Sequence, residues 1–367
     1  MAMNWVIAGG GTGGHVTPAL ALGEAVADRN DRVLFVGSDQ GLEARLVPDA
    51  GFSFEALPSR QVMGRGPIGR VSGILGILDA ARGARRALRS FRPDLVLSVG
   101  GYAAMPAILA AAWGRTPLVL VEPNAIPGRV NRLGARLARE VFVGFESTRA
   151  LFALPDARVH CLGIPLRKAL VDAFRGSSAR VRHEGALHLG VFGGSQGARQ
   201  INETMLAALP QLAEDPIEIF HQTGAADFDR VQAAYKASGV SAEVVEFERD
   251  MPRRYRWAHL ALCRAGALTL AELSLSGLPA LLVPYPFAAD NHQEANARAM
   301  ESAGAAEVLR DRDREGRDGA RVVQAIRSLS ADPLTLPRMS RAALGLSRPS
   351  AAIDIVRACA ASIGGPS

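Results

Sequence analysis

Two short segments, far apart in the chain, share one pattern: an apolar strand, a glycine-rich turn and a helix. The first segment, 4–27, contains GGGTGG, and the second, 188–212, contains GGSQGA. A glycine-rich turn after a buried strand lets backbone N–H groups approach a phosphate at the N-terminus of the next helix, where the helix dipole favours negative charge. Each segment therefore predicts the start of a nucleotide-binding unit, and the chain is expected to contain two such units.

The rest of the chain alternates between short apolar runs, a Gly or Pro, and helical stretches. Such alternation predicts α/β architecture, with parallel sheets covered by helices on both faces. The predicted strands are 5–8, 33–36, 95–99, 118–121, 141–143, 187–192, 217–221, 243–246, 260–263 and 280–283.

Two Rossmann-like domains that face each other across a cleft are therefore expected. We predict the first domain over 1–164 and the second over 165–345, with a hinge near Gly163-Ile164-Pro165. A last helix, at about 351–363 within the segment 346–367, can pack back on the first domain.

The composition excludes several classes of protein. Only Lys168 and Lys236 are lysines among the 42 basic residues, so 40 are arginines, and the net charge is +6. Such a skew reflects codon usage, and we expect no nucleic-acid partner. Three widely spaced cysteines indicate reduced thiols in a cytosolic protein rather than a disulfide framework. We expect no signal peptide, because the first residues lack a basic region. The uncharged stretches 95–114 and 273–289 contain Gly or Pro and predict no membrane span.

Two later segments place polar groups at the ends of predicted strands. Residues 264–272, RAGALTLAE, follow a strand and open a helix, so Thr269 and backbone amides could meet a phosphate. Glu272 could accept hydrogen bonds from both ribose hydroxyls, although taken alone it is more simply a carboxylate on the helix surface. Residues 284–296, PYPFAADNHQEAN, gather polar side chains at the edge where ligands of open α/β sheets bind. This set of side chains suits sugar hydroxyls.

The first glycine loop leaves more than one function open. It satisfies G-x-G-x-x-G, and Asp39 ends the next strand, so a dinucleotide-dependent dehydrogenase is one hypothesis. A tight turn that binds nothing is another. However, a dinucleotide fold needs one such loop and gains nothing from the imidazole of His15. Two loops with an imidazole beside one of them suit a nucleoside diphosphate on one side and a reacting group on the other.

Six motifs occur in the order, and at about the spacing, of one bacterial family: GGGTGGHVTPALAL, GGYAAMPAILAA, EPNAIPGRVNRL, GGSQGARQIN, RAGALTLAEL and DNHQEANA. From about Val6 to Gly304 the chain resembles the MurG family of peptidoglycan N-acetylglucosaminyltransferases. The resemblance implies a GT-B fold, with UDP-N-acetylglucosamine as donor and undecaprenyl-pyrophosphoryl-muramoyl-pentapeptide (lipid I) as acceptor. It also implies inverting transfer to the 4-hydroxyl of the muramoyl sugar, giving lipid II, without a metal or other cofactor. The implied location is peripheral, on the cytoplasmic face of the inner membrane.

The resemblance assigns roles to individual residues. Thr12, Gly13 and Gly14 would line the donor diphosphate side, with His15 as the candidate catalytic base. The other implied contacts are Asn124 with the transferred sugar, Arg167 and Ser195 with phosphate, Ala267, Leu268 and Thr269 with the pyrophosphate, Glu272 with the ribose and Gln293 with the sugar hydroxyls. The uracil would bind backbone near Glu248, where the family usually has isoleucine. The family's common EQN appears here as Glu122-Pro123-Asn124, which keeps the asparagine.

A base must take the proton of the attacking hydroxyl, and a positioned histidine typically contributes 10²–10⁴-fold. Helix N-terminal amides at 195–198 and 268–270, with Arg167, could stabilise the departing diphosphate without a metal. His15 could instead cap its helix or orient the substrate. Asp311 and Asp313 form a formal D-x-D, but they lie in a charged run that predicts solvated surface, and the other histidines lack metal-ligand spacing.

An amphipathic helix over 71–89 is expected to meet the lipid acceptor. Its apolar residues cover more than one helical face and arginines follow them, which suits an anionic interface. The predicted membrane and acceptor face is Ile74, Leu75, Leu78, Arg82, Arg85, Arg86 and Trp113. A core helix with a solvated last turn fits the same pattern, and the resemblance favours the membrane. It leaves room for other cell-wall synthesis or division proteins as partners.

Three other functions remain compatible with the nucleotide-binding motifs. A different GT-B transferase or a UDP-sugar epimerase of similar fold would keep the UDP-binding residues but not the apolar helix edged with arginines. A non-catalytic UDP-sugar sensor would differ from an enzyme in lacking turnover.

Overall fold

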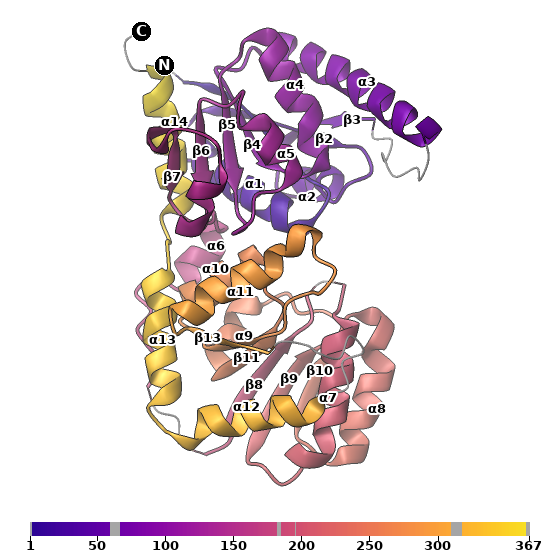
Figure 1. The fold of residues 1–367 in the computed structure, drawn as a ribbon, viewed down its shortest axis with the longest axis vertical. Helices are drawn as coiled ribbons and strands as arrows, with labels where there is room; N and C mark the ends of the chain where they lie inside the picture. The colour runs from indigo at the N-terminus through magenta and orange to yellow at the C-terminus, as the bar shows by residue number, and fades with distance from the viewer. Residues whose placement is uncertain (1, 59–66, 182–184, 195, 310–317, 365–367) are drawn as a thin grey trace. The chain divides into compact units, whose positions relative to one another are not determined.

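The computed structural model describes residues 2–58, 67–181, 185–194, 196–309 and 318–364 (Figure 1). The chain forms two compact units. Unit 1 comprises Met1–Ala169 and Arg348–Ser367, and unit 2 comprises Leu170–Ser347. Within the described ranges, no helix is long and apolar enough to cross a bilayer.

Unit 1 contains a seven-stranded parallel sheet in the order β3-β2-β1-β4-β5-β6-β7. Its central strands are almost fully buried, as expected for a parallel sheet covered on both faces. The strands are β1 (Asn4–Gly9), β2 (Arg32–Ser38), β3 (Ser53–Leu57), β4 (Leu95–Gly100), β5 (Leu118–Glu122), β6 (Glu140–Val143) and β7 (Val159–Cys161).

Helices cover both faces of this sheet. On one face α1 (Gly13–Ala27), α2 (Glu43–Asp49) and α14 (Ala351–Gly364) share a core with Trp5 and Ile7. On the other face α3 (Pro67–Phe91) and α4 (Met105–Gly114) lie side by side (Figure 1). The short helix α5 (Arg129–Gly134) also belongs to unit 1, and α6 (Lys168–Ala173) spans the division between the two units.

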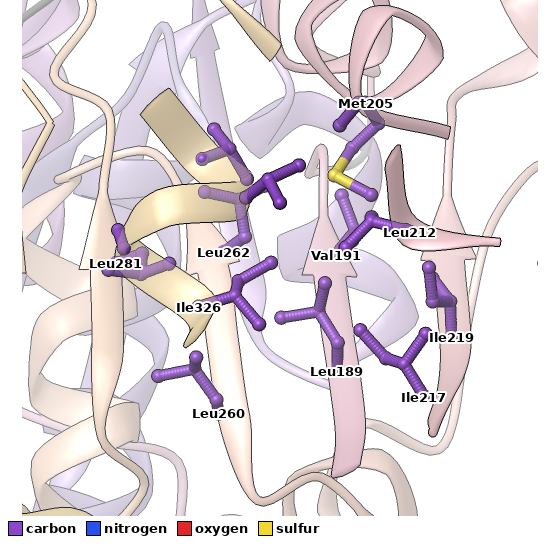
Figure 2. Close-up of a cluster of buried hydrophobic side chains, with 14 of the residues drawn as sticks. Leu189, Val191, Met205, Leu212, Ile217, Ile219, Leu260, Leu262, Leu281 and Ile326 are labelled. Atoms are coloured by element: carbon purple, nitrogen blue, oxygen red, sulfur yellow. The ribbon is translucent and has the colours of Figure 1, made fainter. Parts of the chain in front are cut away.

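Unit 2 repeats the plan with six parallel strands in the order β10-β9-β8-β11-β12-β13. Its strands are β8 (Leu187–Phe192), β9 (Ile217–Gln222), β10 (Ala242–Val245), β11 (Leu260–Cys263), β12 (Ala280–Leu282) and β13 (Ala306–Val308). Its helices are α7 (Arg199–Leu212), α8 (Phe228–Ser238), α9 (Met251–Trp257), α10 (Ala267–Ser276), α11 (His292–Ser302), α12 (Gly319–Ala331) and α13 (Thr335–Leu346). Figure 2 shows the core of this unit, in which Leu189 and Val191 of β8 pack with Met205 of α7 and Ile326 of α12.

The strand order places a topological switch point in each unit. The chain runs outward in one direction from β1 and in the other from β4, and the same change occurs between β8 and β11. Ligands of open α/β sheets bind in the crevice at the carboxyl ends of such neighbouring strands. The loops after β1 and β4 in unit 1, and after β8 and β11 in unit 2, are therefore the places to look for a site.

The parallel α/β architecture predicted from sequence is confirmed, and each of the ten predicted strands is present within a residue or two of its predicted bounds. The patterns missed three strands, β3, β7 and β13. All three lie at sheet edges.

Candidate active site

A cavity of about 940 Å³ opens at the switch point of unit 2. Its walls come from the loop after β8, the start of α7, the residue after β11 and the segment before α11. It is lined by Gly193, Gln196, Gly197, Ala198, Arg199, Gln200, Glu203, Arg264, Tyr285, Phe287 and Gln293. Of the residues that sequence predicted in unit 2, Gln293 lies on this wall.

The glycine loop on one wall is packed too closely for larger side chains. A Cβ on Gly193 would lie 2.6 Å from Gln222 O, and one on Gly197 would lie 2.2 Å from Thr223 O. Gln222 Nε2 donates to Gly194 O at 3.0 Å and fixes the loop from the end of β9. The loop thus keeps its backbone exposed to the cavity. Ser195, predicted to bind phosphate, lies outside the described residues.

The opposite wall combines an amide, a guanidinium and two aromatic rings. Gln293 Oε1 accepts a hydrogen bond from Tyr285 N at 2.9 Å, so its amide nitrogen is oriented by the backbone. Arg264 donates to Val283 O at 3.1 Å, and its guanidinium lies 5.4 Å from the Tyr285 ring centroid. Tyr285 and Phe287 are exposed, with centroids 5.7 Å apart. Sequence reasoning missed both rings because it read 284–296 for polar groups only.

The predicted pyrophosphate contacts occupy the first turn of α10. Gly266 precedes Ala267, Leu268 and Thr269, and the first intrahelical bond runs from Leu270 N to Gly266 O at 3.0 Å. The first amides of a helix have no intrahelical acceptor, so this turn can bind an anion. These residues are outside the cavity lining as described.

Glu272, one turn further along α10, is not a surface carboxylate. Its Oε2 accepts a hydrogen bond from the buried Tyr255 hydroxyl at 2.7 Å. Burial raises the pKa of Glu272 to about 7, against the opposing effect of that hydrogen bond. Within the part of the chain that the structure describes, its other oxygen has no hydrogen bond, so one oxygen remains for a ligand. Tyr255 carried no sequence signal.

A polar network lies buried beneath the unit 2 loop. His221 Nε2 contacts Asn202 Oδ1 and His221 Nδ1 contacts Tyr235 Oη, each at 3.0 Å. Asn202 Nδ2 donates to Thr223 O at 3.0 Å, next to the glycine loop. Burial lowers the pKa of His221 to about 3, so the imidazole is neutral and structural. Sequence reasoning found no metal-ligand spacing for this histidine and gave it no other role.

Two further polar side chains form hydrogen bonds with the backbone. Asn296, counted among the polar groups of 284–296, is fully buried and donates from Nδ2 to Ala265 O at 3.0 Å. The carboxylate of Glu248, where we expected uracil, accepts from Arg249 N at 2.8 Å and Asp250 N at 2.9 Å. Because the Glu248 carboxylate is hydrogen-bonded within its own loop, the uracil is expected to bind the backbone there rather than this side chain.

In unit 1, His15 lies at the switch point. Thr12 precedes α1, and its Oγ1 lies 3.0 Å from His15 Nδ1. The loop after β4 is adjacent, because a Cβ on Gly101 would lie 2.3 Å from Gly10 O and 3.5 Å from His15 Cγ. Gly13 and Gly14 form the first turn of α1. The structure therefore brings the four residues predicted from the first loop together at one sheet edge.

Asn124 lies in a turn built around a buried carboxylate. Asn124 N and Nδ2 both donate to Glu122 Oε1, at 2.9 and 3.2 Å, and Gly128 N and Asn131 Nδ2 donate to Oε2, each at 2.9 Å. Burial raises the pKa of Glu122, and these hydrogen bonds oppose the rise. The asparagine is thus rigidly held next to the end of β5.

Arg167, predicted to neutralise phosphate, pairs with a carboxylate of its own unit. Its Nε donates to Glu24 Oε1 at 2.7 Å, and Lys168 N donates to Glu24 Oε2 at 2.9 Å. Its contact with phosphate stays a prediction.

The predicted membrane face is partly described. The side chains of Ile74 and Leu75 lie outside the described ones. Leu78 is half-buried, and Arg82 and Arg86 are exposed. Arg85 and Trp113 border a second cavity, of about 460 Å³, which is also lined by Leu88, Arg89, Arg92, Pro93, Ala110, Gly114 and Thr116. Among the described residues, Arg85 Nε is buried there without a hydrogen-bond partner.

No group of three or more His, Cys, Asp or Glu side chains suited to a metal ion occurs within the described ranges. Asp311 and Asp313 lie outside those ranges.

Comparison with known proteins assigns the chain to a family. Residues 5–143 match the glycosyltransferase family 28 N-terminal domain, and residues 188–355 match the C-terminal domain of the same family. Two relatives are each named UDP-N-acetylglucosamine–N-acetylmuramyl-(pentapeptide) pyrophosphoryl-undecaprenol N-acetylglucosamine transferase. The one from Geobacter sulfurreducens is 42% identical over 358 residues, covering 96% of this chain and 97% of the relative. The one from Anaeromyxobacter dehalogenans is 43% identical over 362 residues, covering 97% and 92%.

The crystal structure of Acinetobacter baumannii MurG matches with a TM-score of 0.80 and 29% identity, covering 98% of this chain and 99% of that one. The fold is therefore GT-B, as predicted, and the dehydrogenase hypothesis is wrong. Family models, full-length relatives and fold agree that this chain is a glycosyltransferase of family 28 and belongs to the MurG family.

Proposed function

We propose that this chain transfers N-acetylglucosamine from UDP-N-acetylglucosamine to the 4-hydroxyl of the muramoyl sugar of lipid I and so produces lipid II. The observation that carries the proposal is the identity of 42% over 96% of the chain with a relative named for these substrates. The length of the match matters, because it includes both glycine loops and the segments that line the unit 2 cavity.

The donor binds in unit 2. The cavity at the β8–β11 switch point offers backbone amides, the Arg264 guanidinium and the Gln293 amide. These groups match a diphosphate and a sugar, because amides and guanidinium bind phosphate oxygens and an oriented carboxamide binds hydroxyls. The ribose binds the free oxygen of Glu272, and Ala267, Leu268 and Thr269 bind the pyrophosphate through the first turn of α10.

Departure of UDP leaves negative charge on the diphosphate. The N-terminal amides of α7 and α10 are fixed dipoles that need no reorganisation during the reaction, and they stabilise this charge. Arg167 and Ser195 add to that stabilisation.

His15 accepts the proton of the acceptor hydroxyl. When Nδ1–H donates to Thr12 Oγ1, the imidazole is in the tautomer in which Nε2 is the basic nitrogen. As the hydroxyl oxygen attacks the anomeric carbon, the bond to UDP breaks and the proton passes to Nε2. Asn124, held by Glu122, contacts the transferred sugar.

The enzyme acts peripherally on the cytoplasmic face of the inner membrane. Exposed Arg82 and Arg86, with Arg85 and Trp113 at the second cavity, supply positive charge and an aromatic ring that suit an anionic lipid interface. The predicted face also includes the apolar residues Ile74, Leu75 and Leu78, of which the structure describes the side chain of Leu78.

The test is transfer of labelled N-acetylglucosamine from its UDP form to a short-chain lipid I analogue, with EDTA present. Labelled disaccharide-lipid is the expected product. Tight binding of the UDP-sugar without transfer would support the proposed donor and contradict the proposed acceptor.

His15→Ala should lower kcat by about 10²–10⁴-fold, because it removes a general base, with little change in the Kd of UDP-N-acetylglucosamine. A kcat within threefold of the parent would end the role of His15 as base.

A further inference from the structure

A buried carboxylate lies beneath the first glycine loop. Glu43, the first residue of α2, is 1% exposed. Its Oε2 accepts a hydrogen bond from Gly11 N at 2.8 Å, and its Oε1 accepts one from Ser38 N at 3.0 Å. One side chain therefore fastens the loop after β1 to the end of the neighbouring strand β2.

Three glycines make room for this carboxylate. A Cβ on Gly10 or on Gly41 would lie 2.2 Å from carboxylate atoms of Glu43, and a Cβ on Gly37 would lie 2.7 Å from its Cγ. Real Cβ atoms do not come so close to other heavy atoms. Gly10 follows β1, Gly37 lies in β2 and Gly41 follows β2, so their common requirement is the space that Glu43 occupies.

The carboxylate is held by backbone dipoles. No Lys, Arg or His side chain pairs with Glu43 among the described residues. Burying an ion is costly unless hydrogen bonds compensate it, and amide-to-carboxylate bonds are about twice as strong as neutral ones. A stability role alone is better served by an apolar side chain of similar volume, since replacing buried ionic groups in this way is often neutral or stabilising.

The loop is also packed from the opposite side. A Cβ on Gly101 would lie 2.3 Å from Gly10 O, and a Cβ on Gly11 would lie 2.6 Å from the Tyr102 ring. Gly10 and Gly11 are thus clamped between Glu43 and the loop after β4. His15 follows only four residues later, in the first turn of α1. Any shift of the clamped peptides is therefore transmitted directly to Thr12 and His15.

We propose that Glu43 is a positioning residue that sets the conformation of the 9–15 loop and thereby the place of Thr12 and His15 in the transfer reaction. The inference rests on the proposed assignment of this loop to the reacting site. Glu43 does not touch substrate. It acts through the backbone, and a displacement of about 1 Å in such a site can cost about 10²-fold in rate.

The decisive variant is Glu43→Gln, because it preserves size. The carboxamide can accept one of the two backbone amides, but its NH₂ group then faces the other N–H. We expect kcat to fall by about 10–100-fold, with a smaller change in the Kd of UDP-N-acetylglucosamine, since most of the contacts predicted for the donor are in unit 2. Glu43→Asp keeps the charge but shortens the side chain, so it should lower kcat as well.

The matched control is Asp31→Asn. Asp31 is also a buried carboxylate, and it accepts from Met3 N at 2.8 Å and Trp5 Nε1 at 3.1 Å. It precedes β2 and faces the start of β1, which is the sheet edge opposite the loops. Asp31→Asn should lower the Tm in the same way as Glu43→Gln and leave kcat within twofold. A merely structural role for Glu43 would give the two variants the same kcat.

A kcat for Glu43→Gln within twofold of the parent would overturn the inference, as would a loss no larger than that of Asp31→Asn at equal Tm. Gly10→Ala is an independent test if Glu43→Gln does not fold, because its Cβ displaces the carboxylate from the other side and should lower kcat similarly. His15→Ala, run in parallel, separates the two proposals. If His15→Ala keeps the kcat of the parent while Glu43→Gln loses it, the assignment of His15 as base fails and the positioning role of Glu43 stands. If His15→Ala loses kcat while Glu43→Gln keeps it, the positioning role fails.

Discussion

At the scale of single residues, the environment decides what a carboxylate does. Glu43 begins α2, where acidic side chains are ordinary, and Glu272 lies in the second turn of α10. In the structure Glu272 is half-buried and Glu43 is buried, and each accepts a hydrogen bond from a residue outside its own helix, Tyr255 for one and Gly11 for the other. The roles that we propose for them follow from these surroundings.

The raised pKa of Glu272 makes stability depend on pH. The folded protein keeps the carboxyl protonated up to a pKa of about 7, whereas the unfolded chain loses that proton near 4.5. Between these values the folded state binds more protons, so its stability falls as the pH rises. Glu272→Gln cannot ionise, so it should be more stable than the parent at pH 8. The difference in the free energy of unfolding between variant and parent should shift in favour of the variant by about 1–3 kcal/mol from pH 5 to pH 8.

Urea unfolding of both proteins at pH 5 and pH 8 measures this change. Glu55→Gln, on the exposed part of β3, is the control and should show no such difference between the two pH values. An equal effect of Glu272→Gln at both pH values would contradict the prediction.

Where the signal was local, the sequence placed the predicted residues in the correct element. The glycine loops, the start of α10 and Gln293 are defined by neighbours within a few residues, and the structure gives each the expected element. Glu43, Tyr255 and the His221 network escaped notice, because their partners are brought close only by the fold. The rings of Tyr285 and Phe287 were missed for a different reason: apolar residues after a strand look like core until a cavity is seen beside them.

At the scale of elements, sequence predicted every inner strand and the edge strand β10, and missed the other three edge strands. The central strands are continuous apolar runs, which is a strong local signal. Only one of the five residues of β3 is buried, and β7 and β13 have three residues each. Such strands form because a neighbouring strand offers hydrogen bonds, so their own sequence carries little information.

The two faces of helix α3 lie in different environments. Ala80, Ala84 and Leu88 are buried in the core of unit 1, while Arg82 and Arg86 are exposed. The described part of α3 is thus compatible both with a helix that packs in the core and with a helix that faces a membrane. Basic residues near an anionic surface contribute about 1 kcal/mol each, so the arginines alone should produce measurable binding.

We therefore expect the protein to sediment with vesicles that contain anionic lipid, and Arg82→Glu/Arg86→Glu to weaken that binding by about 10-fold or more at low salt. The control is Arg338→Glu/Arg341→Glu on α13, which makes the same change of charge on exposed positions of unit 2. Equal binding by the two double variants would place the membrane contact elsewhere on the chain.

At the scale of the whole molecule, the two units share a strand order but differ in how they are closed. Unit 2 is continuous from Leu170 to Ser347, whereas unit 1 needs α14 from the end of the chain. Ile355, Val356 and Cys359 of that helix are buried in the core that contains Trp5 and Ile7. The glycine loops revealed the repeat, but no local pattern shows which sheet a terminal helix covers.

The contribution of α14 can be measured with two isoleucines. Ile355 is fully buried and Ile353 is 53% exposed on the same helix. Ile355→Ala should lower the free energy of unfolding by about 2–4 kcal/mol through lost burial and a residual cavity, and Ile353→Ala by no more than about 0.5 kcal/mol. Denaturant unfolding followed by circular dichroism measures the change. Similar costs for the two variants would mean that α14 is not seated on that core.

This late helix has a consequence for synthesis on the ribosome. Translation proceeds at about 5–20 residues per second, so the stretch from Leu170 to Ser347 separates the two parts of unit 1 by roughly 10–40 s. Until the end of that interval the part of the Trp5 and Ile7 core that α14 covers is exposed on the nascent chain, although α1, α2 and every strand of unit 1 have already been made. Exposed apolar surface of this kind is what chaperones bind and what aggregates. The part of the enzyme that emerges first is thus the last to be finished.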